Sequence, residues 1–180
     1  MPDRLPQPHE YSPHHERYIS LVTTPVLTAL RDQERTLPQF LRGVSEADAG
    51  YRYASGKWSI REVVGHIFDA ERIYQYRALC FARGESGVLP GWDPDEYATH
   101  AGFEQRTMHS LIDEFLAVRE STLRLFNSFD RSAWDRRGMV SGGFLSVRAL
   151  AYIAVGHAQR HLNVLAERYG VGAPEAIAAT

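Results

Sequence analysis

Residues 59–83 read SIREVVGHIFDAERIYQYRALCFAR, and this stretch predicts a long amphipathic helix. Ser59 followed three residues later by Glu62 is the pattern of a capping box, in which the two side chains bond backbone amides at the helix start. Apolar side chains then recur with helical spacing, at Ile60, Val63, Val64, Ile67, Phe68, Ile73 and Tyr74. We expect the helix to end near Arg83, with Gly84 as the stop signal.

Three further stretches carry helical patterns, and no stretch predicts a strand with any strength. One runs from about Pro25 to Leu41, with Thr24 as its N-cap, and Pro38 within it should kink or break the helix. Another runs from near Thr107 to near Phe129. The last runs from Ser146, its N-cap, to Tyr169, and a glycine follows as the stop signal.

Four amphipathic helices predict an all-α protein, a four-helix bundle with a long connection after the second helix. We divide the chain into an N-terminal extended segment (1–17), the bundle (18–170) and a C-terminal tail (171–180). The connection, Gly84 to Gly102, is rich in glycine, proline and acidic residues. A connection of this length is either a functional cover over a site or a solvated loop, and the sequence leaves both open.

Composition excludes several classes of function. The chain has 180 residues and a formal net charge of −2, so nothing in its charge predicts binding to nucleic acid or to an anionic membrane. The single cysteine, Cys80, rules out an intrachain disulfide and fits a cytoplasmic setting. The longest apolar run, from Ala149 to Val155, is too short to span a bilayer, and we expect neither a membrane segment nor a secretory signal.

Two histidines on the last predicted helix form a candidate metal site. His157 and His161 are four residues apart, so both rings project from one face, about 6 Å apart along the helix axis. The pair interrupts an apolar stripe, where unsatisfied imidazole nitrogens would be unfavourable. One ion bound by both rings would satisfy a nitrogen of each, whereas the spacing alone is also common in exposed pairs.

His66 on the second predicted helix also faces the interior, because apolar residues flank it at helical spacing. A single inward histidine is commonly a core residue that bonds a carbonyl or a carboxylate. Three inward histidines on two helices favour a shared divalent ion, with zinc, nickel and ferrous iron all suited to imidazole ligands. Three neutral ligands leave coordination positions open and favour ionisation of a bound water or thiol, as catalysis requires.

Two stretches of the sequence resemble the DinB/YfiT-like superfamily of metal-binding four-helix bundles. The first runs from Tyr51-Arg52-Tyr53-Ala54 through Gly56-Lys57-Trp58-Ser59-Ile60-Arg61-Glu62-Val63-Val64-Gly65-His66 to Asp69 and Glu71-Arg72, and the second from Arg148 through Gly156-His157 to His161-Leu162-Asn163. The resemblance implies that His66, His157 and His161 are metal ligands, and it implies a cytoplasmic homodimer. Members of the superfamily include S-transferases that use low-molecular-weight bacterial thiols, a thiol-dependent isomerase and proteins described as metal-dependent hydrolases.

These features predict an enzyme that acts on a small-molecule substrate. The metal would activate either a low-molecular-weight thiol, as in an S-transferase, or water, as in a hydrolase, and the ligand set suits both. The rival hypothesis is a non-catalytic metal-binding or interaction protein of the same fold.

Several other residues are weaker candidates for the site. Glu62 and Asp69 could orient a ligand imidazole or act as a general base, although Glu62 already caps its helix and Asp69 could pair with Arg72. His100 is a possible fourth ligand, and Trp92 would line the site if the long connection folds over it. The remaining candidates are expected elsewhere: Cys80 in the core, too far along the helix to share the ion, and His9, His14, His15 and His109 on the surface.

Overall fold

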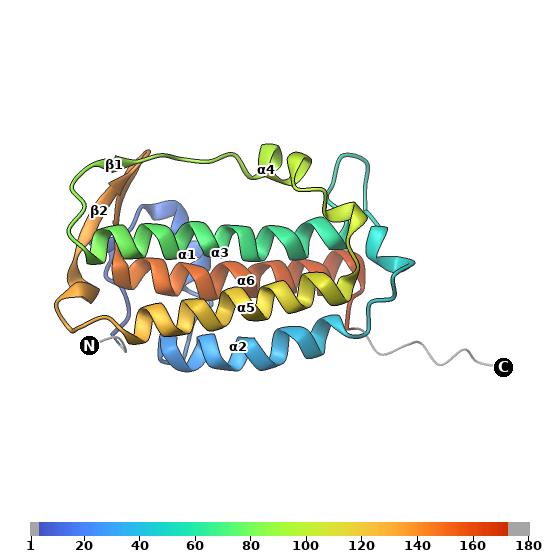
Figure 1. The fold of residues 1–180 in the computed structure, drawn as a ribbon, viewed down its shortest axis with the longest axis horizontal. Coiled ribbons are helices and arrows are strands. Elements are labelled where there is room, and N and C mark those ends of the chain that lie inside the picture. The colour runs from blue at the N-terminus through green and yellow to red at the C-terminus, as the bar shows by residue number, and fades with distance from the viewer. Residues whose placement is uncertain (1–3, 173–180) are drawn as a thin grey trace.

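Four long helices lie side by side in the computed structural model, which describes residues 4–172 (Figure 1). They are α2 (Val26–Leu41), α3 (Ile60–Ala82), α5 (Met108–Asn127) and α6 (Val147–Tyr169). Helix α3 packs against α5 and α6, and α2 packs against the same two helices from the other side. The expected four-helix bundle is therefore confirmed. Within the described residues, no helix is long and apolar enough to cross a membrane.

The helix ends follow the capping signals of the sequence. At the start of α3, the Ser59 amide donates to the Glu62 carboxylate at 2.7 Å, and the Glu62 amide donates to the Ser59 hydroxyl at 3.2 Å. Ser146 caps α6 in the same way by accepting from the Ala149 amide. Gly170 ends α6 with a φ of 71°, a left-handed conformation that favours glycine.

Helix α2 differs from expectation because it continues through Pro38 to Leu41. Pro38 stands in the last turn, so the helix loses only one interior amide donor there. The neighbouring side chains Leu37 and Leu41 are fully buried, and this packing holds the last turn in place. The N-cap is Pro25 rather than Thr24.

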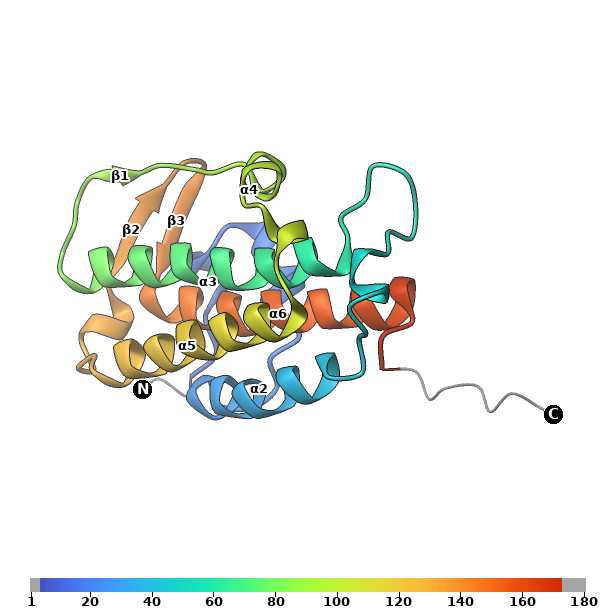
Figure 2. The ribbon, with the colours of Figure 1, turned by 45° about the vertical axis from the view of Figure 1, so that its right-hand side comes forward.

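The long connection runs back along the bundle, so the helices do not simply alternate in direction. The colours of Figure 1 show that α3 and α5 run the same way, with the connection passing over α3 between them. It contains β1 (Val88–Leu89) and α4 (Pro94–His100), which begins at Asp93 as N-cap (Figure 2). The remaining short elements of the described chain are α1 (Glu16–Ile19) and the 3₁₀ turns Pro8–Glu10, Pro13–His15, Asp48–Gly50, Phe103–Gln105 and Ala133–Asp135.

A small three-stranded sheet corrects the expectation that strands are lacking. Strand β2 (Arg137–Val140) pairs in parallel with β1 and antiparallel with β3 (Gly143–Ser146). The two residues between β2 and β3 include Gly142, whose φ of 99° suits a tight hairpin turn. Strands this short carry too little alternating pattern to be recognised, and β1 forms only because β2 lies beside it.

A buried ion pair joins α3 to α5. The Arg119 guanidinium donates to both carboxylate oxygens of Glu71 at 2.8 Å, and both side chains are almost fully buried. Gln33 on α2 accepts from Arg119 at 3.0 Å and donates to the Val155 carbonyl of α6 at 3.0 Å. One polar network thus connects all four helices of the bundle.

We expect Glu71→Gln to lower the free energy of unfolding by about 3 kcal/mol, because Arg119 would remain charged and buried without its counter-ion. Urea unfolding followed by circular dichroism measures the change. Glu120→Gln, which removes an exposed partner of Arg124, is the matched control and should leave the midpoint unchanged. A Glu71→Gln protein as stable as the parent would contradict the structural role of the pair.

Candidate metal centre

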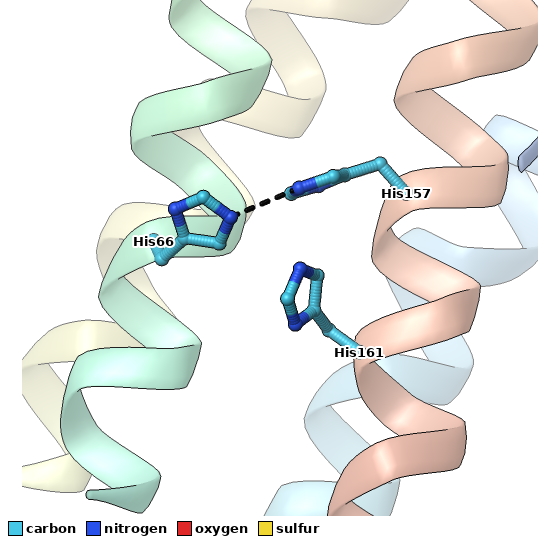
Figure 3. A group of neighbouring side chains, drawn as sticks. All are labelled: His66, His157 and His161. Carbon is cyan, nitrogen blue, oxygen red and sulfur yellow. Dashed lines mark hydrogen bonds between the residues drawn. The ribbon is translucent and has the colours of Figure 1, made fainter. Parts of the chain in front are cut away.

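Three histidine rings from two helices point toward one another between α3 and α6 (Figure 3). His66 projects from α3, and His157 and His161 project from α6 one turn apart. The Nε2 atoms of His66 and His157 are 3.0 Å apart, and one nitrogen from each of the three rings lies within 4.8 Å of the others. His66 and His157 are buried, and His161 is half-buried. The structure therefore brings together the three histidines that the sequence singled out.

The geometry fits one divalent ion. Imidazole nitrogen binds zinc at about 2.0–2.1 Å, so two nitrogens on one ion lie at most about 4.2 Å apart. The His66–His157 separation of 3.0 Å is within this limit, and all three nitrogens lie within 4.8 Å of one another, which is close to it. Three imidazoles suit zinc, nickel or iron and leave further coordination positions for other ligands.

Burial keeps the three histidines neutral. Desolvation lowers the pKa of His66 to about 3 and that of His161 to about 4, and it places the pKa of His157 well below its usual value. Repulsion from His161 lowers the pKa of His66 and His157 further. At neutral pH each ring therefore has a free lone pair on one nitrogen, which is the form that binds a metal.

Aromatic side chains surround two of the candidate ligands. Trp58 and Trp92 flank His66, with ring centroids at 4.6 Å and 5.6 Å. Tyr18 and Tyr74 pack edge-on against His157 at 5.4 Å and 5.7 Å. These rings fix the orientation of the histidines and restrict the access of water to them.

The glycines that precede two of the histidines, Gly65 before His66 and Gly156 before His157, stand where no side chain would fit. A Cβ atom on Gly65 would lie 2.4 Å from the Phe103 ring, and one on Gly156 would lie 2.0 Å from the Tyr18 carbonyl oxygen. The glycines thus let two covering segments approach the helices beside His66 and His157. A side chain at either position would push a covering segment away from the site.

A cavity of about 340 Å³ opens beside the histidines. His66 and His157 lie in its wall, together with Tyr74 and Arg77 of α3. Trp92 also lines it, as expected if the long connection folds over the site. The β2–β3 turn completes this wall, and Ser141 donates its amide to Leu89 of the connection at 3.2 Å. The unexpected sheet therefore holds the connection against the cavity.

The N-terminal segment supplies the opposite side of the cavity. Residues 12–18 contribute lining side chains, including His14 and His15. His15 was expected on the surface but is half-buried, and burial lowers its pKa to about 4. The segment is held by Glu10, which accepts from the Ser146 hydroxyl at 2.9 Å and from Arg148 at 3.2 Å. Contacts between residues this far apart leave no local signal in the sequence.

Other predicted site residues lie apart from the histidines. Glu62 pairs with Arg52 at 2.6 Å in addition to its capping role, and Asp69 pairs with Arg72 at 3.3 Å. Their proposed action on a ligand imidazole stays a prediction. His100 is exposed at the end of α4, near Asp69, and Cys80 is half-buried beside a different surface hollow. Within residues 4–172, the histidine, cysteine and acidic side chains close enough to share an ion are the three histidines.

Sequence reasoning missed Arg77 and Tyr74 as cavity residues. Arg77 follows His66 by eleven residues, which is just over three helical turns, so helical periodicity places both on one face of α3. That signal was present in the sequence. Tyr74 was expected in the apolar stripe, and its place in the cavity wall depends on how the helices pack.

Fold and site together define a four-helix-bundle protein with a histidine triad able to hold a metal ion. A model of the DinB superfamily matches residues 29–165, and the chain belongs to this superfamily. A search of curated proteins found no significant match.

Two solved structures share the fold. YfiT from Bacillus subtilis, described as a probable metal-dependent hydrolase with an unusual four-helix bundle topology, is similar with a TM-score of 0.74 and 13% identity over 94% of this chain and 95% of YfiT. A mycothiol-dependent maleylpyruvate isomerase is similar with a TM-score of 0.64 and 14% identity. That match covers 82% of this chain and 60% of the isomerase. At such identities the likeness establishes the fold alone.

We expect Gly156→Ala to destabilise the protein by about 1–3 kcal/mol, because the new methyl group would meet the Tyr18 carbonyl. Thermal and urea unfolding measure the change. Gly43→Ala is the matched control, since a Cβ atom there would meet no atom within 4 Å. Equal stability of the two variants would contradict the close packing of the N-terminal segment on α6.

The metal-free protein should lose stability as the pH falls below about 6.5. The unfolded chain binds protons at its histidines there, whereas the pKa values of about 3 and 4 keep His66 and His161 neutral in the folded state. The unfolded state therefore binds more protons, and each such histidine lowers the free energy of unfolding by about 1.4 kcal/mol per pH unit between about pH 6.5 and its folded pKa. This stability is fully present above pH 6.5.

Urea unfolding of the metal-free protein at several pH values between about 7 and 5 measures the slope. His161→Gln should make the slope less steep by the contribution of one histidine, about 1.4 kcal/mol per pH unit. An unaltered slope in His161→Gln would contradict the depressed pKa.

Proposed function

We propose that this protein is a metal-dependent enzyme in which His66, His157 and His161 hold one divalent ion. The observation that carries the proposal is that the three ligand nitrogens converge, and that two of the three rings, His66 and His157, line a cavity with room for a small molecule. A closed structural site would have a fourth protein ligand instead. The two structural neighbours, one described as a probable metal-dependent hydrolase and the other as a mycothiol-dependent isomerase, support an enzymatic role.

When bound, the ion supplies a Lewis acid that lowers the pKa of water or of a thiol. The histidines, held neutral by burial, keep the full charge of the ion available for this. Trp58 and Trp92 shield His66 from solvent, which strengthens electrostatic effects in the site.

Tyr74 is suited to donate a hydrogen bond to the substrate. Burial raises its pKa, so the phenol stays protonated at neutral pH. Its hydroxyl group has no hydrogen-bond partner within residues 4–172, and its side chain lines the cavity. A phenol in this position can stabilise negative charge that develops on a reacting oxygen or sulfur.

The site accommodates two versions of the reaction. In one, a low-molecular-weight thiol forms a carbon–sulfur bond with an electrophilic substrate. The product is a thioether when the thiol adds across a double bond or displaces a leaving group, and an isomer when the thiol adds and is then expelled. In the other, water attacks and the reaction is a hydrolysis. Homodimer formation, a cytoplasmic setting and the choice among zinc, nickel and iron stay predictions.

Elemental analysis after purification without an affinity tag, together with turnover assays, tests the proposal. We expect one divalent ion per chain, and metal-dependent turnover with either a bacterial thiol plus an electrophilic dye or a panel of esters. His157→Ala should lose the ion and reduce turnover at least about a hundredfold, because one of three ligands is gone. His109→Ala, which removes an exposed histidine paired with Asp113, is the matched control and should keep both.

Circular dichroism checks that His157→Ala is folded. A metal-loaded protein without turnover over the whole panel would overturn the enzymatic proposal and favour a non-catalytic metal-binding protein. If elemental analysis finds no divalent ion and turnover does not depend on added metal, the proposed metal site is wrong.

A further inference from the structure

One buried arginine in the bundle has no acidic partner. Three arginine side chains are buried in the described chain, and two of them pair with carboxylates: Arg119 with Glu71, and Arg148 with Glu10 and Asp135. Arg77 is 7% exposed and pairs with no carboxylate within residues 4–172. It donates one hydrogen bond, to the Pro90 carbonyl at 2.9 Å.

A buried cation without a counter-ion is unfavourable. Burial lowers the pKa of Arg77, but an arginine side chain stays protonated at any ordinary pH. The Pro90 carbonyl satisfies one donor of the guanidinium and brings no compensating charge. A buried and unpaired charge lowers the stability of the protein. A role in function therefore explains the presence of Arg77 better than a role in stability does.

The position of Arg77 directs that charge toward the candidate metal centre. Eleven residues separate it from His66, so both side chains project from one face of α3, with about 16 Å between them along the axis. Side chains on a helix lean toward its N-terminus, and this direction takes Arg77 toward Tyr74 and His66. All three line the same cavity.

The rest of the cavity wall is also positive or neutral. Arg17, His14 and His15 contribute from the N-terminal segment, and no aspartate or glutamate within the described chain lines the cavity. An ion on the histidine triad would add further positive charge. A cavity of about 340 Å³ with positive and no negative side chains in its described lining favours a small anion as its ligand.

We propose that Arg77 binds a carboxylate group of the small-molecule substrate and thereby determines specificity. The planar guanidinium matches a carboxylate through two parallel hydrogen bonds, and the edge not used by Pro90 is available for them. The substrate then spans the cavity, with its acid group at Arg77 and its reactive group at the histidines. This assignment of a substrate group to Arg77 rests on the proposed function.

Calorimetric titration of the metal-free protein with succinate tests the proposal, with the neutral succinamide as the comparison ligand. We expect saturable binding of succinate and none of succinamide. Arg77→Met should raise the dissociation constant of succinate at least about tenfold, because a charge-assisted pair is lost. Arg83→Met removes an exposed guanidinium at the end of the same helix that does not line the cavity, and it should leave binding unchanged.

Thermal unfolding provides a second readout, since succinate should raise the melting temperature of the parent by more than that of Arg77→Met. Arg77→Lys keeps the positive charge but lacks the planar guanidinium, and it should bind succinate with intermediate affinity. This second variant keeps the test valid if Arg77→Met fails to fold. Absence of succinate binding, equal binding by Arg77→Met, or binding of inorganic phosphate in place of succinate would overturn the proposal. Because the titration uses metal-free protein, a missing metal or a missing turnover would not affect its result.

Discussion

Polar groups inside a helical bundle must find partners, and the rest of this structure depends on how these groups are satisfied. Glu71 and Arg119 satisfy each other and join the helices through Gln33. The imidazoles of His66 and His157 meet at hydrogen-bond distance, with His161 beside them. Arg77 alone depends on a backbone carbonyl. The stability of the bundle and its proposed chemistry therefore arise from the same need to pair buried polar groups. The Glu71–Arg119 network meets this need, whereas Arg77 has no counter-ion in the part of the chain that the structure describes.

The bundle positions the histidines, but segments outside the four long helices make the cavity. The connection brings Trp92 over His66, and the small sheet holds this connection in place. The N-terminal segment closes the other side, with Glu10 as its attachment to Ser146 and Arg148. The cavity thus lies between the helices and two covering segments, which are attached by polar contacts and by buried apolar side chains such as Ile19 and Leu89.

Helix boundaries were predictable because their signals are local. The Ser59–Glu62 capping box and Gly170 act within a few residues, and the structure shows each at work. By the same local rule Pro38 was expected to kink or break its helix. The helix is not broken there, since burial of the neighbouring side chains holds the last turn of α2. The sheet escaped prediction because β1 is two residues long and is defined only by its pairing with β2.

The sequence by itself determined the class of fold and the three candidate ligands. Helical periodicity and spacing place His157 and His161 on one face and His66 in a buried stripe, and these are properties of single helices. Only the tertiary structure decided that the three rings meet, that the N-terminal segment and the connection enclose a cavity beside them, and that Arg77 faces it without a counter-ion. Those facts are contacts between residues far apart in the chain, and no local pattern encodes which distant side chain will lie opposite a given one.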